Sequence, residues 1–206
     1  LHGTTHQVVQ DRIEAGTFMI AAAITQGDVL IKEAIAAHNR PLLSKLEELG
    51  ACVHESEAGL EIVGHPLSQA VAVKTMPYPG FPTDLQPQMA VALLLAKGHS
   101  VLTETVFENR FLYLSELRRM NANYTIKGNA AFLEGNTQFK GAHVEAPDLR
   151  AGAALVLAGL VAQGMTTVRH LHYIDRGYVQ FHRKLQALGA KIDRFDDSNT
   201  PKVQVL

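Results

Sequence analysis

The sequence predicts an α/β domain with pseudo-threefold symmetry, in which three helices are buried at the centre and strands and amphipathic helices surround them. The first observation behind this prediction is an internal repeat, because three long stretches contain the same order of elements. The second is the polarity of the first helix in each repeat: it is apolar almost all round, so we expect it to be buried on every side. The residue pattern leaves one alternative open, an open α/β sandwich built from the same elements.

Each repeat is predicted to have the order strand–helix–strand–helix–strand–strand, and residues 1–206 to form a single domain. The three repeats cover approximately residues 6–64, 69–135 and 138–206. Their first helices are QDRIEAGTFMIAAAITQG, TDLQPQMAVALLLAKG and PDLRAGAALVLAGLVAQG, each with an acid at its start and a glycine at its end. These acids, 73 and 64 residues apart, are Asp11, Asp84 and Asp148.

The remaining elements follow in the same order in each repeat. After the glycines come the β-like runs DVLIKEA, HSVLTETV and TTVRHL, and then the amphipathic helices PLLSKLEELGA, LYLSELRRMNA and FHRKLQALGA. A further strand closes each unit, in ACVHES, NYTIKG and AKIDRF. Alternating strands and helices of this kind pack helices against sheets. We therefore expect the second helices, with charged residues such as Glu47 and Arg118, to form the solvated layer.

Composition argues against several classes of function. Of the 206 residues, 47% are hydrophobic and 19% are charged, which is ordinary for a globular domain with a core. The net charge of −1 predicts no general attraction to nucleic acid or to a membrane surface. No apolar run approaches the ~18 residues that suggest a membrane span. The single cysteine, Cys52, cannot form an internal disulfide, which agrees with a reducing compartment.

Charged residues stand where the three central helices begin. Parallel buried helices bring their N-termini together, and each N-terminus offers unpaired N–H groups and about half a positive charge, which favours an anion. For Asp11 the simpler interpretation is favoured, that of an N-cap. For Asp84 and Asp148 a role in a functional site is favoured over that of an N-cap, because arginines stand at the same ends of the repeats. Arginine side chains bind phosphate and carboxylate groups well. These arginines are Arg110, Arg150 and Arg176.

One of these aspartates could accept a proton within a pocket for an anionic, phosphate-bearing substrate. Neighbouring arginines stabilise the charged carboxylate and make it a weaker base. Such a base works only if it is held against the hydroxyl that it deprotonates. The stiff segment PYPGFPTDLQPQ has no equivalent before Asp11 or Asp148. It indicates that the Asp84 carboxylate is held in a fixed position in addition to capping a helix.

Other candidate residues carry weaker signals. His170 and His172 would share one face of a strand, but no Cys or third His stands at ligand spacing, so we expect surface histidines and no metal site. The glycine in PYPGFP belongs to no phosphate loop of the G-x-x-x-x-G-K-[ST] type. Cys52 is expected to be a small buried packing residue, since no base stands beside it. No cofactor is predicted.

Several long motifs, in the right order, resemble one family. PYPGFPTDLQPQ, TVFENRF, PDLRAGAALVLAGLVAQG, YIDRGY and the opening HQVVQDRIEAGTF are similar to the UDP-N-acetylglucosamine 1-carboxyvinyltransferases, the enolpyruvyl transferases of peptidoglycan synthesis. The similarity extends through essentially all 206 residues. It implies transfer of the enolpyruvyl group of phosphoenolpyruvate to the 3-hydroxyl of UDP-N-acetylglucosamine, with release of phosphate, in the bacterial cytoplasm. The family fold is two inside-out α/β domains that close over a cleft.

The resemblance also implies roles for individual residues. Asp84 matches the carboxylate that contacts the sugar and accepts the proton of the attacking hydroxyl, and Asp148 matches a second acid near the reacting carbon. Val106 matches the residue that contacts the sugar nucleotide through its backbone. The arginines that line the phosphoenolpyruvate site match Arg110, Arg150 and Arg176.

The resemblance covers about the C-terminal half of such an enzyme. The mobile-loop cysteine and an N-terminal lysine of the family have no counterpart here, and Cys52 does not inherit that role. We therefore expect a chain cut from a longer one, inactive until the missing N-terminal half is supplied. Two alternatives stay open: a non-catalytic fragment that binds the sugar nucleotide or serves a structural role, and an enzyme like 5-enolpyruvylshikimate-3-phosphate synthase.

Overall fold

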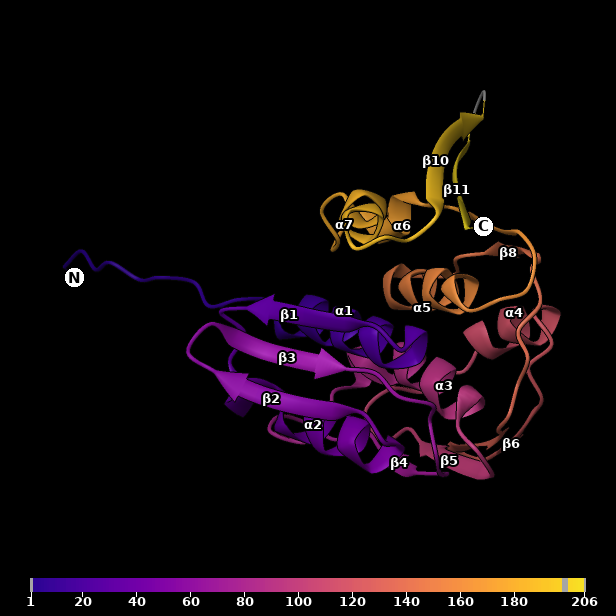
Figure 1. The fold of residues 1–206 in the computed structure, drawn as a ribbon, viewed down its shortest axis with the longest axis horizontal. Coiled ribbons are helices and arrows are strands. Elements are labelled where there is room, and N and C mark those ends of the chain that lie inside the picture. Colours follow the sequence, from indigo (N-terminus) through magenta and orange to yellow (C-terminus); the bar gives the residue numbers. More distant parts are fainter. Residues whose placement is uncertain (1, 198–199, 206) are drawn as a thin grey trace.

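The computed structural model describes residues 2–197 and 200–205 and has an α/β architecture with three repeats arranged around central helices (Figure 1). The first repeat contains α1 (Arg12–Thr25), β1 (Asp28–Lys32), α2 (Ala36–Leu49), β2 (Cys52–Ser56) and β3 (Gly59–Val63). The second contains β4 (Ala72–Lys74), the short 3-10 helix η1 (Thr83–Leu85), α3 (Gln86–Leu95), β5 (His99–Thr103), α4 (Tyr113–Arg119), β6 (Tyr124–Lys127) and β7 (Ala130–Glu134). The third contains β8 (His143–Glu145), α5 (Leu149–Leu160), β9 (Thr166–Arg169), α6 (His172–Asp175), α7 (Phe181–Ala187), β10 (Ile192–Asp197) and β11 (Thr200–Val205).

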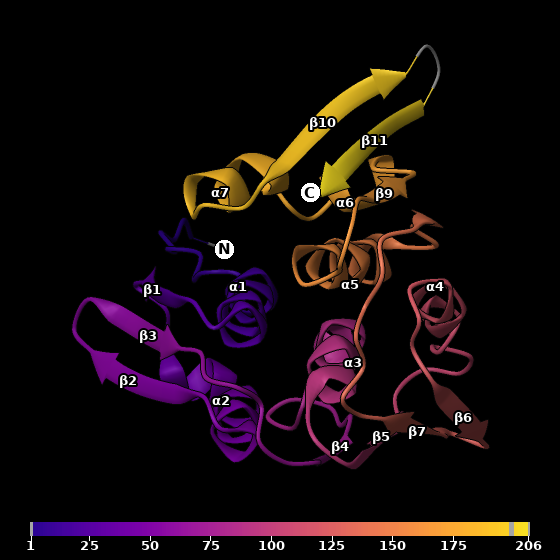
Figure 2. The same cartoon turned by 45° about the vertical axis from the view of Figure 1, so that its right-hand side comes forward.

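Helices α1, α3 and α5 contact one another at the centre, and a view along them shows the sheets and outer helices around them (Figure 2). Nine consecutive residues of α3, Gln86–Leu94, are buried, as are nine of α5, Ala151–Gly159. Small residues permit this close packing. A Cβ added to Gly152 would lie 2.7 Å from Cγ1 of Ile174 in α6. The predicted α/β fold with three buried helices is confirmed.

The second and third sheets share one topology, and the first sheet has the same strand order without the leading strand. The second sheet has the order β4-β5-β7-β6 and the third has the equivalent order β8-β9-β11-β10. In both, the leading strand is parallel to its neighbour, as β4 is to β5 and β8 is to β9, and the other pairs are antiparallel. The first sheet has only three strands, in the order β1-β3-β2. The place beside β1 that a leading strand would take is therefore not filled by a described strand.

The repeat order predicts a strand before α1, from about residue 6, and this prediction was thus wrong. Residues 2–10 form no helix or strand, and Val8 and Val9 are 83% and 59% exposed. A segment that buries so little apolar surface does not offset the conformational entropy lost when a strand forms. One hydrogen bond, from the Gln10 side chain to the Lys32 carbonyl at 2.7 Å, holds its end near β1.

Three local predictions also need correction. The run TTVRHL ends as a strand at Arg169, and His170 takes a left-handed conformation with φ of 63°, so His170 and His172 do not share a strand face. The helix predicted in FHRKLQALGA stops at Ala187, and a separate four-residue helix, α6, precedes it. Cys52 is exposed, because it begins β2 at the outer edge of the first sheet.

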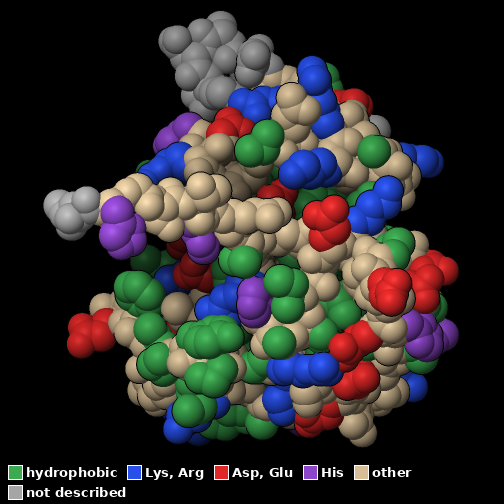
Figure 3. Space-filling model, turned by 90° about the vertical axis from the view of Figure 1, so that its left-hand side faces the viewer, with side chains coloured by type: hydrophobic (Ala, Val, Ile, Leu, Met, Phe, Trp, Pro, Cys, Tyr) green, Lys and Arg blue, Asp and Glu red, His purple; other side chains and the backbone are tan. Residues whose placement is uncertain are grey.

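The surface agrees with the balanced composition. On the face in Figure 3, acidic and basic side chains are interspersed. Within residues 2–197 and 200–205, no helix has the length and apolar character needed to cross a membrane.

The central position of α3 leads to a stability prediction. Leu93 is fully buried on α3, whereas Leu188, just after α7, is 53% exposed. We expect Leu93→Ala to lower the free energy of unfolding by about 2–5 kcal/mol, because it leaves a cavity among the three helices. Leu188→Ala should change this free energy by about 0.5 kcal/mol or less. Chemical denaturation of the two variants measures both values, and equal losses would contradict the central position of α3.

Candidate active site

The segment before α3 fixes the position of Asp84 through its own hydrogen bonds. The Met76 N–H donates to the Phe81 carbonyl at 2.9 Å, and the Gly80 N–H donates to the Pro77 carbonyl at 2.8 Å, so the proline-rich segment closes on itself. Asp84 then lies within η1 and not at the N-cap of α3, a position that Leu85 takes without a side-chain cap. The helix-cap interpretation of Asp84 was therefore wrong, and its carboxylate remains available for side chains.

The Asp84 carboxylate lies between two arginines from different repeats. Arg110, in the segment before α4, donates from Nη2 to Oδ1 at 3.1 Å. Arg150, in the first turn of α5, donates to Oδ2 from Nη2 at 3.1 Å and from Nε at 3.3 Å. The Arg110 and Arg150 side chains are only 16% and 14% exposed, against 38% for Asp84. The three residues therefore form a half-buried cluster with one positive charge in excess.

Aromatic rings support both guanidinium groups. The guanidinium carbon of Arg110 lies 4.9 Å from the centre of the Phe107 ring, and that of Arg150 lies 5.5 Å from the centre of the Tyr178 ring. Contacts of this kind favour the cation. Burial lowers the pKa of Arg150, but Tyr178 and Asp84 outweigh this effect and raise the pKa above its ordinary value. Arg150 therefore stays charged in the cluster.

The other predicted residues make no hydrogen bond or ion pair with the Asp84 carboxylate among the described residues. Asp148 caps α5 and accepts hydrogen bonds from the Arg150 N–H at 2.8 Å and the Ala151 N–H at 2.9 Å. Asp11 caps α1 in the same way, as predicted. Arg176 ends α6 with an exposed side chain, and no ion pair joins it to Asp84 among the described residues. Val106 is 41% exposed in the segment that leads to Arg110.

A buried polar network beneath the cluster ties the three repeats together. The Tyr178 hydroxyl lies 2.9 Å from Oγ1 of Thr17 in α1, and either atom can be the donor. The Gln88 amide, in α3, donates to Thr17 Oγ1 and to the Tyr178 hydroxyl, both at 3.1 Å. Because the Tyr178 ring also lies against Arg150, this network connects the helix packing to the charged cluster.

Glu104 is the buried acid that the sequence did not single out. It follows β5, it is 3% exposed, and it accepts five hydrogen bonds from side chains and backbone. Burial raises its pKa, but hydrogen bonds from Thr75, Val106, Phe107 and Thr83 outweigh this effect and lower the pKa below the ordinary 4.5. The only signal in the sequence is an acid flanked by threonines at the end of a predicted strand.

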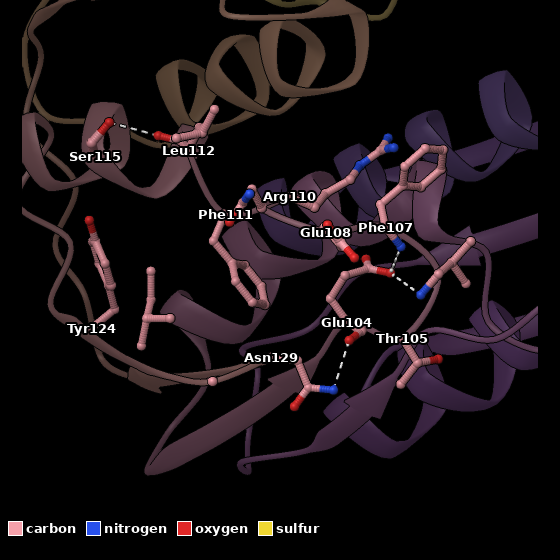
Figure 4. Close-up of a pocket in the computed structure, with 14 residues that line it drawn as sticks. Glu104, Thr105, Phe107, Glu108, Arg110, Phe111, Leu112, Ser115, Tyr124 and Asn129 are labelled. Carbon is pink, nitrogen blue, oxygen red and sulfur yellow. Dashed lines mark hydrogen bonds between the residues drawn. The ribbon is translucent and has the colours of Figure 1, made fainter.

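A cavity of about 840 Å³ opens beside the stretch of chain that begins at Glu104 (Figure 4). The segment Glu104–Leu112 forms one wall, and residues of β6 and of the turn after it, such as Tyr124 and Asn129, form the other. Its aromatic and polar lining suits a ligand larger than a single phosphate.

Metal-binding residues do not gather in the part of the chain that the structure describes, where no group of three or more His, Cys, Asp or Glu side chains could hold an ion. The rings of His170 and His172 lie 6.0 Å apart, between centres, near the surface.

The lowered pKa of Glu104 predicts a dependence of stability on pH. A carboxylate whose pKa is lower in the folded protein than in the unfolded chain stabilises the fold at any pH above its pKa in the unfolded chain. This stabilisation is lost as the pH falls through the pKa of the carboxylate in the folded protein. We expect the difference in unfolding free energy between wild type and Glu104→Gln to be greatest above pH ~5 and to shrink below pH ~4. Urea denaturation across this range measures the difference.

Glu134→Gln provides the control for this experiment. Glu134 lies in β7 of the same sheet with an exposed side chain, and the substitution makes the same change of charge. Its difference from wild type should be small at every pH. A difference for Glu104→Gln that stays constant or grows on acidification would contradict the lowered pKa.

The chain is similar to known proteins in both sequence and fold. The family model for EPSP synthase (3-phosphoshikimate 1-carboxyvinyltransferase) matches residues 1–205. The structure of the enolpyruvyl transferase NikO from Streptomyces tendae is similar, with a TM-score of 0.79 and 25% sequence identity over 97% of this chain and 46% of NikO. The structure of EPSP synthase from Acinetobacter baumannii has a TM-score of 0.72 and 18% identity over 98% of this chain and 47% of that enzyme, and so shows the fold alone.

The chain thus spans less than half the length of these solved structures. Within that span, the family model covers all three repeats, including the cluster of Asp84, Arg110 and Arg150. The chain belongs to the EPSP synthase (3-phosphoshikimate 1-carboxyvinyltransferase) family of enolpyruvyl transferases.

Proposed function

We propose that this chain forms one side of the active site of an enolpyruvyl transferase that uses phosphoenolpyruvate and UDP-N-acetylglucosamine, in peptidoglycan synthesis. The observation that carries the proposal is the Asp84 carboxylate held between Arg110 and Arg150 beside the N-termini of α3 and α5. The motifs around these residues, PYPGFPTDLQPQ and TVFENRF, favour the sugar nucleotide as acceptor. The other side of the cleft would come from the N-terminal half of the enzyme.

The two arginines suit the anionic groups of phosphoenolpyruvate. Arg110 Nε and Arg150 Nη1 are buried and have no hydrogen-bond partner among the described residues, so each guanidinium keeps an unused donor. A phosphate or carboxylate binds such planar donors in pairs. Because the same groups now bind Asp84, the arriving anion would compete with Asp84 for them. Binding of phosphoenolpyruvate would therefore free the carboxylate.

The freed carboxylate can then act on the acceptor. The 3-hydroxyl oxygen of the sugar bonds to C2 of the enolpyruvyl group, its proton passes to Asp84, and the phosphate leaves with the electron pair of its C–O bond. A general base of this kind contributes about 10²–10⁴-fold to the rate. Asp148 is proposed as the second acid near the reacting carbon, and Arg176 as a further contact for the phosphate.

Val106 would contact the sugar nucleotide through its carbonyl. Its N–H already donates to Glu104 at 2.7 Å, and its carbonyl oxygen accepts no hydrogen bond from the described residues. A carbonyl accepts hydrogen bonds, so it fits an N–H or O–H of the acceptor, such as the N–H of the acetamido group.

A second candidate acceptor is 3-phosphoshikimate. The family model that matches residues 1–205 is that of 3-phosphoshikimate 1-carboxyvinyltransferase, and this observation favours an enzyme of that specificity. Asp84, Arg110 and Arg150 would serve the same chemistry with either acceptor, so the segment around Val106 and Phe107 must distinguish them.

Complementation tests both candidates. Alone, the chain should release no phosphate from phosphoenolpyruvate, because water fills an open site and weakens its electrostatics. With the N-terminal half of a UDP-N-acetylglucosamine-specific transferase added, we expect phosphate release that requires UDP-N-acetylglucosamine. Asp84→Asn should reduce that release by about 10²-fold or more. Asp28→Asn, a change to an exposed aspartate of β1 beyond the far end of α1, is the matched control.

The outcomes separate the hypotheses. Phosphate release that requires 3-phosphoshikimate, when a matching N-terminal half is supplied, would transfer the assignment to the second candidate. Binding of UDP-N-acetylglucosamine without turnover in any combination would leave a non-catalytic sugar-nucleotide-binding fragment. Steady release by the chain alone would contradict the need for a second half.

A further inference from the structure

The segment Glu104–Arg110 contains two residues of the proposed site, Val106 and Arg110, yet it forms no helix or strand. Its path depends on contacts with Glu104. The Oε1 atom of Glu104 accepts hydrogen bonds from the Val106 N–H at 2.7 Å and the Phe107 N–H at 3.1 Å (Figure 4). The backbone of Glu104 is held in turn by Asn129, whose side-chain amide donates to the Glu104 carbonyl at 3.0 Å.

The same carboxylate also holds the turn that carries Asp84. The second oxygen, Oε2, accepts hydrogen bonds from the Thr83 hydroxyl at 2.9 Å and the Gln86 amide at 3.3 Å. These residues lie immediately before and two positions after Asp84. One side chain thus connects the turn of the proposed base with the segment of the proposed sugar contact.

Only a carboxylate fits this place. A third donor, the Thr75 hydroxyl, binds Oε1 at 2.7 Å, so five donors converge on two oxygens. An ionised carboxylate accepts at both oxygens, whereas a glutamine offers one acceptor oxygen and presents an NH₂ group to the remaining donors. Burial of a charge is costly unless hydrogen bonds satisfy it. All five donors are neutral hydroxyl, amide or backbone groups, and Arg110 is not among them. The Glu104 carboxylate therefore orients the segment Glu104–Arg110 without forming an ion pair with Arg110.

We propose that Glu104 is a positioning residue for acceptor binding, which sets the Val106 backbone and the Asp84 turn at a fixed separation. The proposal rests on the proposed function, because it gives the segment 104–110 a role in binding the sugar nucleotide. The proposal gives Glu104 no contact with either substrate, because its carboxylate is occupied by protein donors. It acts through Val106, Phe107 and Thr83.

Amide NMR spectroscopy of the 206-residue chain, titrated with UDP-N-acetylglucosamine, tests this role. In wild type, we expect the ligand to shift the Val106 and Phe107 amide resonances. In Glu104→Gln, these two amide protons should lie upfield before ligand is added, because a neutral acceptor replaces a charged one. The affinity for UDP-N-acetylglucosamine should fall about fivefold to tenfold, the effect of losing one or more hydrogen bonds that orient the site.

Two further variants keep the test decisive. Glu134→Gln makes the same change of charge in the same sheet and should leave the affinity and both amide resonances unchanged. Thr83→Val removes one donor to Oε2 while Glu104 stays in place. It should weaken UDP-N-acetylglucosamine binding about fivefold with the Val106 amide unshifted, and it carries the test if Glu104→Gln does not fold.

The results distinguish the positioning role of Glu104 from the proposed function on which it rests. Equal affinity of wild type, Glu104→Gln and Thr83→Val for UDP-N-acetylglucosamine would overturn the positioning role and leave the proposed function standing. Failure of wild type to bind UDP-N-acetylglucosamine, both alone and with the N-terminal half supplied, would overturn the sugar-nucleotide assignment, and the role of Glu104 with it. Reduced affinity in both variants, with Glu134→Gln unchanged, would support the role.

Discussion

The whole domain depends on the burial of three helices that have no polar face. Helices α1, α3 and α5 can be buried only against one another and against the surrounding sheets, and the core follows from that packing. The Thr17, Gln88 and Tyr178 network brings together one residue from each repeat at the N-terminal halves of these helices. Because the helices run side by side, the packing of the core also decides which charges meet at their ends.

The three repeats contribute unequally to the charged cluster at the ends of the central helices. The second repeat supplies Asp84 and Arg110, the third supplies Arg150, and Arg12 of the first lies over the Tyr78 ring instead. The two guanidinium groups stabilise the charged carboxylate between them. Beneath it, Glu104 and Tyr178 contact the segments that carry the cluster, so contacts within the protein fix the positions of these segments.

Much of this fold could be predicted from the sequence because helix polarity and the internal repeat are strong signals. The apolar helices, the order of most elements and the closeness of Asp84 to arginines all follow from residue patterns. Glu104 could not be found in this way, since an acid after a strand is usually solvated and its burial depends on a segment that folds back over it. Arg176 makes no ion pair with Asp84 among the described residues, and it follows the short helix α6, which the residue pattern did not predict.

The most direct test of this account is a double-mutant cycle between Asp84 and Arg150, which lie in different repeats. With Asp84→Asn and Arg150→Gln, singly and together, the unfolding free energies should show a coupling of about 1–2 kcal/mol, less than for a fully buried pair because Asp84 is 38% exposed. The exposed pair of Arg40 and Glu55 should show about 0.5 kcal/mol or less. Additive effects at Asp84 and Arg150, within about 0.3 kcal/mol, would contradict the claim that helix packing brings these two residues from different repeats into one cluster.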